Sequence, residues 1–176
     1  MILIDLNQVL ISNLMVQVNC NPKTKVDENL VRHLALNCIR SYMKQFKATY
    51  GEAVLCCDSK KYWRRDIFPF YKSHRKKDRD SSGFDWETIF ETLHKIRREL
   101  KEYFPYKVIE VEGAEADDVI AVLTKKFSAS EPILVISNDR DFVQLLKYDN
   151  VTIYQPMKSG FVQKIGDTRD ETHKLY

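Results

Sequence analysis

The stretch EADDVIAVLTKKF, residues 115–127, decides the fold of this chain together with the segment that follows it. Its apolar residues recur at helical spacing, which predicts an amphipathic helix. Three carboxylates are crowded into its first turn, namely Glu115, Asp117 and Asp118. Downstream, Ile133-Leu134-Val135-Ile136 is typical of a buried strand, and it runs into the acids Asp139 and Asp141. A helix that leads into a buried strand predicts a parallel α/β unit.

Two earlier apolar runs also stop on an acid. Ile2-Leu3-Ile4 ends at Asp5, and Val54-Leu55-Cys56-Cys57 ends at Asp58. Parallel sheets bind ligands at the carboxyl ends of their strands, so we expect these acids to converge with those of the 115–127 helix. Carboxylates brought together repel one another unless a cation neutralises them, and all-oxygen ligands suit Mg²⁺ or Mn²⁺.

A simpler explanation exists for each acid taken alone. Acids in the first turn of any helix are favoured by its dipole, and an Asp after a strand is a common helix cap or turn residue. For Glu115, Asp117 and Asp118 by themselves the dipole is the better explanation. Neither preference predicts that apolar strands lead into acids three separate times, and this coincidence favours the metal site.

The rest of the chain continues the alternation of strands and helices. Helices are predicted from Asp27 to a stop at Gly51 and from Asp85 to Phe104, with a short one at 142–146. Further strands are expected at 107–111 and 151–154, and residues 7–24 are polar and predict an irregular connection with at most a short helix. We therefore expect an α/β fold, a three-layer sandwich around a mostly parallel sheet, over residues 1–157, followed by a polar tail at 158–176.

Composition narrows the class of protein. At 176 residues and 44% hydrophobic content, the chain suits one globular domain, and no apolar run approaches the roughly 20 residues of a membrane span. No signal peptide is expected, and four cysteines without CxxC spacing fit free thiols in the cytoplasm. The four histidines are scattered, so zinc is not expected.

A basic segment at 59–84 is too long for an ordinary strand-to-helix connection of about 2–6 residues. Between residues 59 and 80 it carries a net charge of +6, which leaves −3 on the rest of the chain. Aromatic residues alternate with cations there, a pattern typical of nucleic-acid binding because cations neutralise phosphates and rings stack on bases. A solvated loop is the simpler alternative. The candidate nucleic-acid contacts are Arg64, Arg65, Tyr71, Lys72, Arg75, Lys76, Lys77 and Arg79.

The basic segment directly follows Asp58, so a polyanion bound by it would lie over the acids. Metals held by carboxylates activate water and stabilise charge on a phosphodiester, with two ions about 3.5–4 Å apart in many nucleases. The sequence offers no Ser/His/Asp or Cys/His set, and no GxxxxGK(S/T) loop of a nucleotide-hydrolysing motor.

EADD at 115–118 and SNDRDF at 137–142, with the early Asp5 and Asp58, resemble the 5′-nuclease superfamily, which includes flap endonucleases and the 5′-exonuclease domains of bacterial DNA polymerases. WRRD at 63–66 and YK at 71–72 resemble the basic arch of a phage member of this family. The likeness covers nearly all of residues 1–157, and the EADD–DxD combination is its specific part.

The resemblance implies a Mg²⁺-dependent 5′→3′ exonuclease and flap endonuclease that removes RNA primers during phage or bacterial replication. By that likeness the first metal belongs to Asp5, Asp58, Glu115, Asp117 and Asp118, and the second to Asp139 and Asp141. Lys72 corresponds to an arch lysine at the scissile phosphate, and so joins the catalytic set. The implied partners are DNA and RNA/DNA duplexes with 5′ ends or flaps, then a single-strand binding protein or sliding clamp. A monomer in the cytoplasm of a bacterial host is expected.

One departure from the family leaves alternatives open. Family members continue into a helix–hairpin–helix region with a GDxxDN signature, which this chain lacks unless GDTRD at 166–170 is a degenerate form; we interpret it as coincidence. Residues 158–176 then form the start of the missing region. Two other hypotheses remain, a PIN-type single-strand ribonuclease and a catalytically incomplete nucleic-acid binding fragment.

Overall fold

The computed structural model describes residues 1–163, and the GDTRD segment lies outside them. Six strands form one sheet in the order β3-β2-β1-β4-β5-β6, in which β1 to β5 run parallel and β6 is antiparallel to β5. The strands are β1 Ile2–Asp5, β2 Ala53–Cys57, β3 Lys107–Glu110, β4 Ile133–Ile136, β5 Val151–Gln155 and β6 Gly160–Phe161. The predicted α/β class with a mostly parallel sheet is confirmed.

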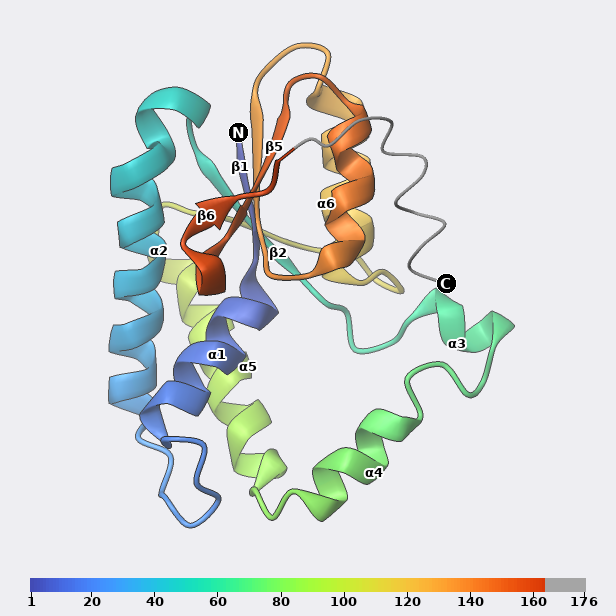
Figure 1. Ribbon diagram of the computed structural model, residues 1–176. Coiled ribbons are helices and arrows are strands. Elements are labelled where there is room, and N and C mark those ends of the chain that lie inside the picture. The colour runs from blue at the N-terminus through green and yellow to red at the C-terminus, as the bar shows by residue number, and fades with distance from the viewer. Residues whose placement is uncertain (164–176) are drawn as a thin grey trace.

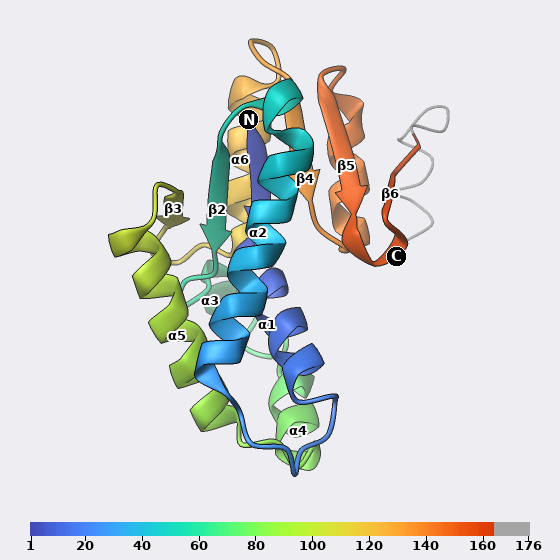
Figure 2. The same ribbon diagram turned by 90° about the vertical axis from the view of Figure 1, so that its left-hand side faces the viewer.

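Helices cover both faces of the sheet (Figure 1). One face carries α1 (Leu6–Gln17), α2 (Glu28–Tyr50) and α5 (Trp86–Tyr103), and the other carries α6 (Ala116–Phe127) and the 3₁₀ helix η1 (Arg140–Lys147). A short 3₁₀ turn, η2 (Pro156–Lys158), leads into β6. Figure 2 gives the view from the side of α2 and α5.

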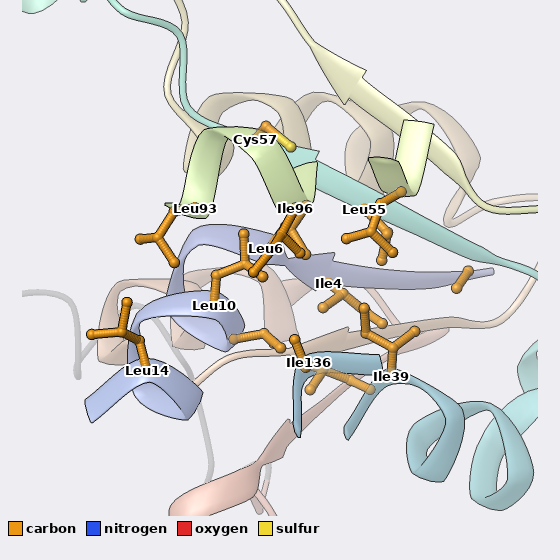
Figure 3. Close-up of a cluster of buried hydrophobic side chains, with 14 of the residues drawn as sticks. Ile4, Leu6, Leu10, Leu14, Ile39, Leu55, Cys57, Leu93, Ile96 and Ile136 are labelled. Atoms are coloured by element: carbon orange, nitrogen blue, oxygen red, sulfur yellow. The ribbon is translucent and has the colours of Figure 1, made fainter. Parts of the chain in front are cut away.

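The core on the α1 face explains why this layer forms. Ile4, Leu55 and Ile136 point from three adjacent strands toward the helices, and Leu10 and Ile96 meet them there (Figure 3). All five are nearly inaccessible to solvent. Burying a large aliphatic side chain contributes about 1.5–3 kcal/mol, so this layer fixes the positions of the strand ends.

The predicted irregular connection at 7–24 is wrong over most of its length, because α1 is a helix of 12 residues. Asp5 caps it, since the Asp5 side chain accepts a hydrogen bond from the Gln8 backbone N–H at 3.1 Å. Its buried residues Leu6, Val9, Leu10 and Leu14 share one face, but apolar residues also lie elsewhere on the helix, such as the exposed Val16, and this blurs the helical stripe in the sequence. Packing against α2 and the sheet, rather than amphipathic pattern, therefore stabilises this helix.

The basic segment 59–84 contains two short helices, α3 (Trp63–Ile67) and α4 (His74–Ser81), that stand away from the sheet (Figure 1). We call residues 59–84 the arch. Backbone hydrogen bonds from Ser59 N to Ala114 O and from Trp63 N to Gly113 O, at 3.0 and 2.8 Å, tie its start to the loop before α6. At its far end, the Trp86 indole donates to Ser82 Oγ at 2.7 Å. Neither helix buries a residue, so the arch depends on these attachments and on polar contacts.

Candidate functional site

The acids at the strand ends gather at one edge of the sheet, beside β1, where the strand order changes direction. Asp58 joins three elements there. One of its carboxylate oxygens accepts a hydrogen bond from the Ala116 backbone N–H at 2.7 Å, and the other accepts one from the Asn7 side chain at 2.6 Å. The end of β2 is thereby fastened to the start of α6 and to α1.

Asp5 and Asp117 carry charge that their surroundings do not neutralise. Burial raises the pKa of Asp5 to about 7 against a hydrogen bond from Gln8, and repulsion from Asp117, Asp58 and Asp139 adds to the rise. Burial, followed by repulsion from Asp139, raises the pKa of Asp117 to about 6. Acids that shift one another's pKa lie within electrostatic range, so four separate segments contribute to one negative site.

Glu115 and Asp118 face the arch and are neutralised by it. The Glu115 side chain is 2% exposed and binds Lys72 Nζ at 2.5 Å and Arg64 Nη1 at 2.9 Å. Tyr71 donates its hydroxyl hydrogen to the same carboxylate at 2.8 Å. Arg64 holds both Asp118 oxygens, at 2.7 and 2.8 Å, and the Trp63 indole adds a contact at 3.2 Å.

Charge pairing favours the charged forms of Asp118 and Lys72, whereas the pKa shift of Asp5 favours its neutral form. Burial alone would raise the pKa of Asp118, but hydrogen bonds led by Arg64 outweigh it and hold that pKa below its usual range. Burial alone would lower the pKa of Lys72, but hydrogen bonds with Glu115 and Tyr71 raise it. The site therefore has a neutralised half beside the arch and an uncompensated half around Asp5 and Asp117.

The residues fit a hard divalent cation by their chemistry, because the uncompensated half offers only carboxylate oxygens. Within residues 1–163, however, no group of three or more His, Cys, Asp or Glu side chains has the geometry to hold a metal. Asp58 already accepts two hydrogen bonds, and Glu115 and Asp118 point toward Arg64 and Lys72. The acids are gathered, but they are not arranged as a ready coordination shell.

Asp139 and Asp141 follow β4. Asp139 caps η1 by accepting a hydrogen bond from the Asp141 backbone N–H at 2.9 Å. Asp141 lines a cleft of about 440 Å³ together with Asp117, Asp118, Arg64 and Tyr71. This cleft connects the two predicted metal positions with the arch residues.

The other predicted nucleic-acid residues line two further clefts, and Arg75 and Arg79 belong to both. Arg75 and Arg79 line a cleft of about 700 Å³ that reaches Asp58 and runs between α1, α4 and α5. Lys76, Arg65 and Lys72 line a smaller one of about 370 Å³ within the arch. Lys77 is exposed on α4.

Sequence reasoning missed two polar residues of the site, Asn7 and Gln8, and the contact between Trp63 and Asp118. Gln8 accepts a hydrogen bond from the Asn138 backbone N–H at 2.7 Å and so holds the loop after β4 against α1. A helix cap at Asp5 would have placed Asn7 and Gln8 beside the strand end. No local signal marked Trp63 as a partner of Asp118, because the two are 55 residues apart.

Acids gathered at the ends of parallel strands offer oxygen ligands to a cation, and the arch beside them offers positive charge to a polyanion, a combination that suits a nuclease. Residues 1–173 match the family described as 5′-3′ exonuclease, N-terminal resolvase-like domain, and the chain belongs to that family. The resemblance drawn from the EADD and DRD motifs is confirmed.

Among curated proteins, the chain is 47% identical to ribonuclease H of Enterobacteria phage T4 over 165 residues, which cover 92% of this chain and 53% of the phage protein. It is 31% identical to a 5′-3′ exonuclease of Streptomyces coelicolor over 121 residues, or 67% of this chain and 39% of that protein. The matched part of the chain thus covers about half of the length of the phage ribonuclease H and about two fifths of the length of the Streptomyces exonuclease.

Solved structures of phage T5 proteins share the fold. A T5 5′-exonuclease with bound zinc superposes with a TM-score of 0.72 at 19% identity, covering 93% of this chain and 57% of that one. A T5 flap endonuclease in complex with DNA and metal ions gives a TM-score of 0.71 at 20% identity, covering 92% and 57%.

Proposed function

We propose that this chain is the catalytic part of a Mg²⁺-dependent 5′→3′ exonuclease and flap endonuclease that hydrolyses phosphodiester bonds in DNA and RNA/DNA duplexes. The observation that carries the proposal is the pair of half-buried carboxyls, Asp5 and Asp117, whose pKa values are raised by partial burial and by neighbouring acids at a site that Lys72 of the cationic arch also reaches electrostatically. Such a site favours a divalent cation and a polyanion together. The metal ions in the T5 structures support it by analogy of fold.

The ligands are assigned to two ions, of Mg²⁺ or Mn²⁺. Asp5, Asp58, Glu115, Asp117 and Asp118 serve the first, and Asp139 and Asp141 serve the second. When bound, such ions activate water and stabilise the charge that develops on the phosphodiester. Asp117, a proposed ligand of the first ion, and Asp141, a proposed ligand of the second, line the same cleft, which supports two neighbouring metal positions.

On the substrate side, Lys72 and Arg64 neutralise the phosphate next to the site, and the remaining cations of the arch hold the strand. The cleft of about 700 Å³ is lined by the cations Arg75 and Arg79 and by the aromatic residues Trp86 and Phe90, and the Arg79 guanidinium lies 5.6 Å from the centre of the Phe90 ring. Phosphates match the cations, and unpaired bases match the aromatic rings by stacking.

The wider role rests on relatives about twice the length of this chain. We propose removal of RNA primers during replication, by a monomer in the cytoplasm of a bacterial host, with a single-strand binding protein or sliding clamp as partner. The proposed catalytic domain, predicted over residues 1–157, extends at least through β6, because Gly160 and Phe161 pair with β5 of the same sheet. None of the helices within residues 1–163 is long and apolar enough to cross a bilayer.

Incubation with a 5′-flap substrate and Mg²⁺ tests the activity. The expected result is release of short 5′ products, lost in Asp139→Asn and kept in Asp85→Asn. The latter is a matched control, because Asp85 likewise caps a helix but is exposed and outside the site. Preference for unstructured RNA over flaps would favour the PIN-type ribonuclease, and EDTA-resistant binding without cleavage would favour a binding fragment.

A further inference from the structure

The contacts between the arch and the start of α6 occupy most of the hydrogen-bond acceptor sites of Glu115 and Asp118. Glu115 receives hydrogen bonds from Lys72 on one oxygen and from Arg64 and Tyr71 on the other. Both Asp118 oxygens are held by Arg64, and the oxygen that Trp63 contacts also accepts the Glu115 backbone N–H at 3.0 Å. A carboxylate has about four acceptor sites, so little capacity remains on either side chain for a metal.

Two further observations show that these contacts hold the arch in a particular state. Lys72 has a backbone φ of +53°, a left-handed conformation that strains a residue with a side chain. Its side chain and that of Arg64 lie at 5.1 and 5.8 Å from the Tyr71 ring centre, which adds cation–π attraction. Strain at one residue persists only where surrounding contacts enforce it, and at Lys72 these are the ion pair with Glu115 and backbone hydrogen bonds of the local turn, such as Ser73 N to Phe70 O at 3.0 Å.

We propose that Arg64 and Lys72 form a latch on Glu115 and Asp118 that competes with divalent metal for these carboxylates. Metal binding displaces the two cationic side chains, and only then are they free for a substrate phosphate. The start of the arch stays in place, because Ser59 and Trp63 remain bound to the loop before α6 through backbone hydrogen bonds. The side chains of the latch move, and the attachment does not.

This inference rests on the proposed function, since it assigns a regulatory role within the same site. Metal binding and latch closure are linked by one coupling free energy. If metal binding opens the latch, removing the latch must increase the affinity for metal by the same free energy. A purely structural salt bridge predicts the opposite, because losing it would loosen the start of α6 and weaken the metal site.

Mg²⁺ titration without nucleic acid measures the coupling. The double variant Arg64→Met/Lys72→Met removes the latch cations and keeps an unbranched side chain, one atom shorter than that of Lys and two atoms shorter than that of Arg. The control Arg65→Met/Lys76→Met removes the same charge from exposed positions of the same arch. By calorimetry, the latch variant should bind Mg²⁺ about fivefold more tightly or better than the control, a typical size for coupling between sites.

A spectroscopic signal reports the latch directly. The chain has two tryptophans, so Trp86→Phe leaves Trp63 as the only probe, and its indole N–H contacts Asp118. Because this change also removes the Trp86–Ser82 attachment of the arch, the background is used only if its Mg²⁺ affinity by calorimetry equals that of wild type. Mg²⁺ should shift Trp63 emission in this background and should shift it much less when Arg64 and Lys72 are Met.

Equal or weaker Mg²⁺ binding by the latch variant, with normal binding by the control, would overturn the latch and leave the proposed function intact. Mg²⁺ binding absent from wild type and both variants would overturn the metal-dependent function and the latch together.

Discussion

Replacing Asp5 by Asn should stabilise the metal-free protein at pH 8, although Asp5 is a predicted metal ligand. Asn caps helices about as well as Asp, so the bond to the Gln8 N–H is kept while the buried charge is removed. Because Asp5 has a pKa of about 7 in the folded protein against 3.8 as its ordinary value, the folded state binds the proton more tightly than the unfolded chain. The free energy of unfolding therefore falls as pH rises between these two values.

The magnitude follows from the shift. A rise from 3.8 to about 7 sets an upper limit of ~4 kcal/mol on the destabilisation above pH 7. Water and salt ions at the site reduce it, so we expect Asp5→Asn to gain ~2 kcal/mol at pH 8, or roughly 4–8 °C in melting temperature for a chain of this size. The gain shrinks by up to ~1.4 kcal/mol for each pH unit below 7, and near pH 5 it should vanish.

Thermal unfolding followed by circular dichroism in EDTA, at pH 5 and pH 8, measures both values. Asp27→Asn is the matched control, because Asp27 caps α2 in the same way from an exposed position. The control should change little at either pH. A gain for Asp5→Asn of the same size at both pH values, or a loss at pH 8, would refute the reasoning.

Three further results are expected. Leu14→Ala should lower the free energy of unfolding in urea by about 3 kcal/mol, because Leu14 is fully buried. Val16→Ala on the same helix should lower it by under ~0.5 kcal/mol, because Val16 is 68% exposed. Losses of similar size would contradict the orientation of α1 described above. Gly51→Ala should lower the free energy of unfolding by about 1 kcal/mol, because φ is +82° there and a side chain strains that conformation. No heavy atom lies within 4 Å of the new methyl group, so the loss would come from the backbone alone. An unchanged melting temperature would contradict the positive φ at Gly51. Mg²⁺ affinity measured by calorimetry should rise from pH 5 to pH 8, because Asp5 and Asp117 must lose their protons to bind metal. For each proton released, the affinity should rise by up to about tenfold per pH unit. An affinity that does not change with pH would exclude both residues as ligands.

Much of the fold could be predicted from local pattern. The helix from Asp27 to Gly51 is bounded by a cap and by a glycine with positive φ, and both boundaries agree with α2. Short apolar runs that end at Asp5 and Asp58 predicted the strands β1 and β2 correctly, because a strand buried on both faces needs a continuous apolar run. Val122 is the exception within α6, since it is apolar but 64% exposed.

The helix α1 and the strand β6 were not predictable in the same way. α1 carries polar residues between its buried ones and is stabilised by neighbours distant in the sequence, such as α2. β6 is a two-residue edge strand whose pairing with β5 depends on the turn at η2, where Ser159 adopts a left-handed conformation.

The amino-acid sequence by itself determined which charged groups the site contains. These are the acids at the ends of apolar strands, the acids at the start of a helix, and the cations of the basic segment. Which acids are neutralised was decided by the tertiary structure, because Arg64 reaches Glu115 and Asp118 across 51 and 54 residues of chain. Local pattern sets the positions of charges along the chain, whereas pairing between them depends on how the sheet and the arch bring distant segments together. For this reason Asp5 and Asp118 look alike in the sequence and have pKa values shifted in opposite directions in the folded protein.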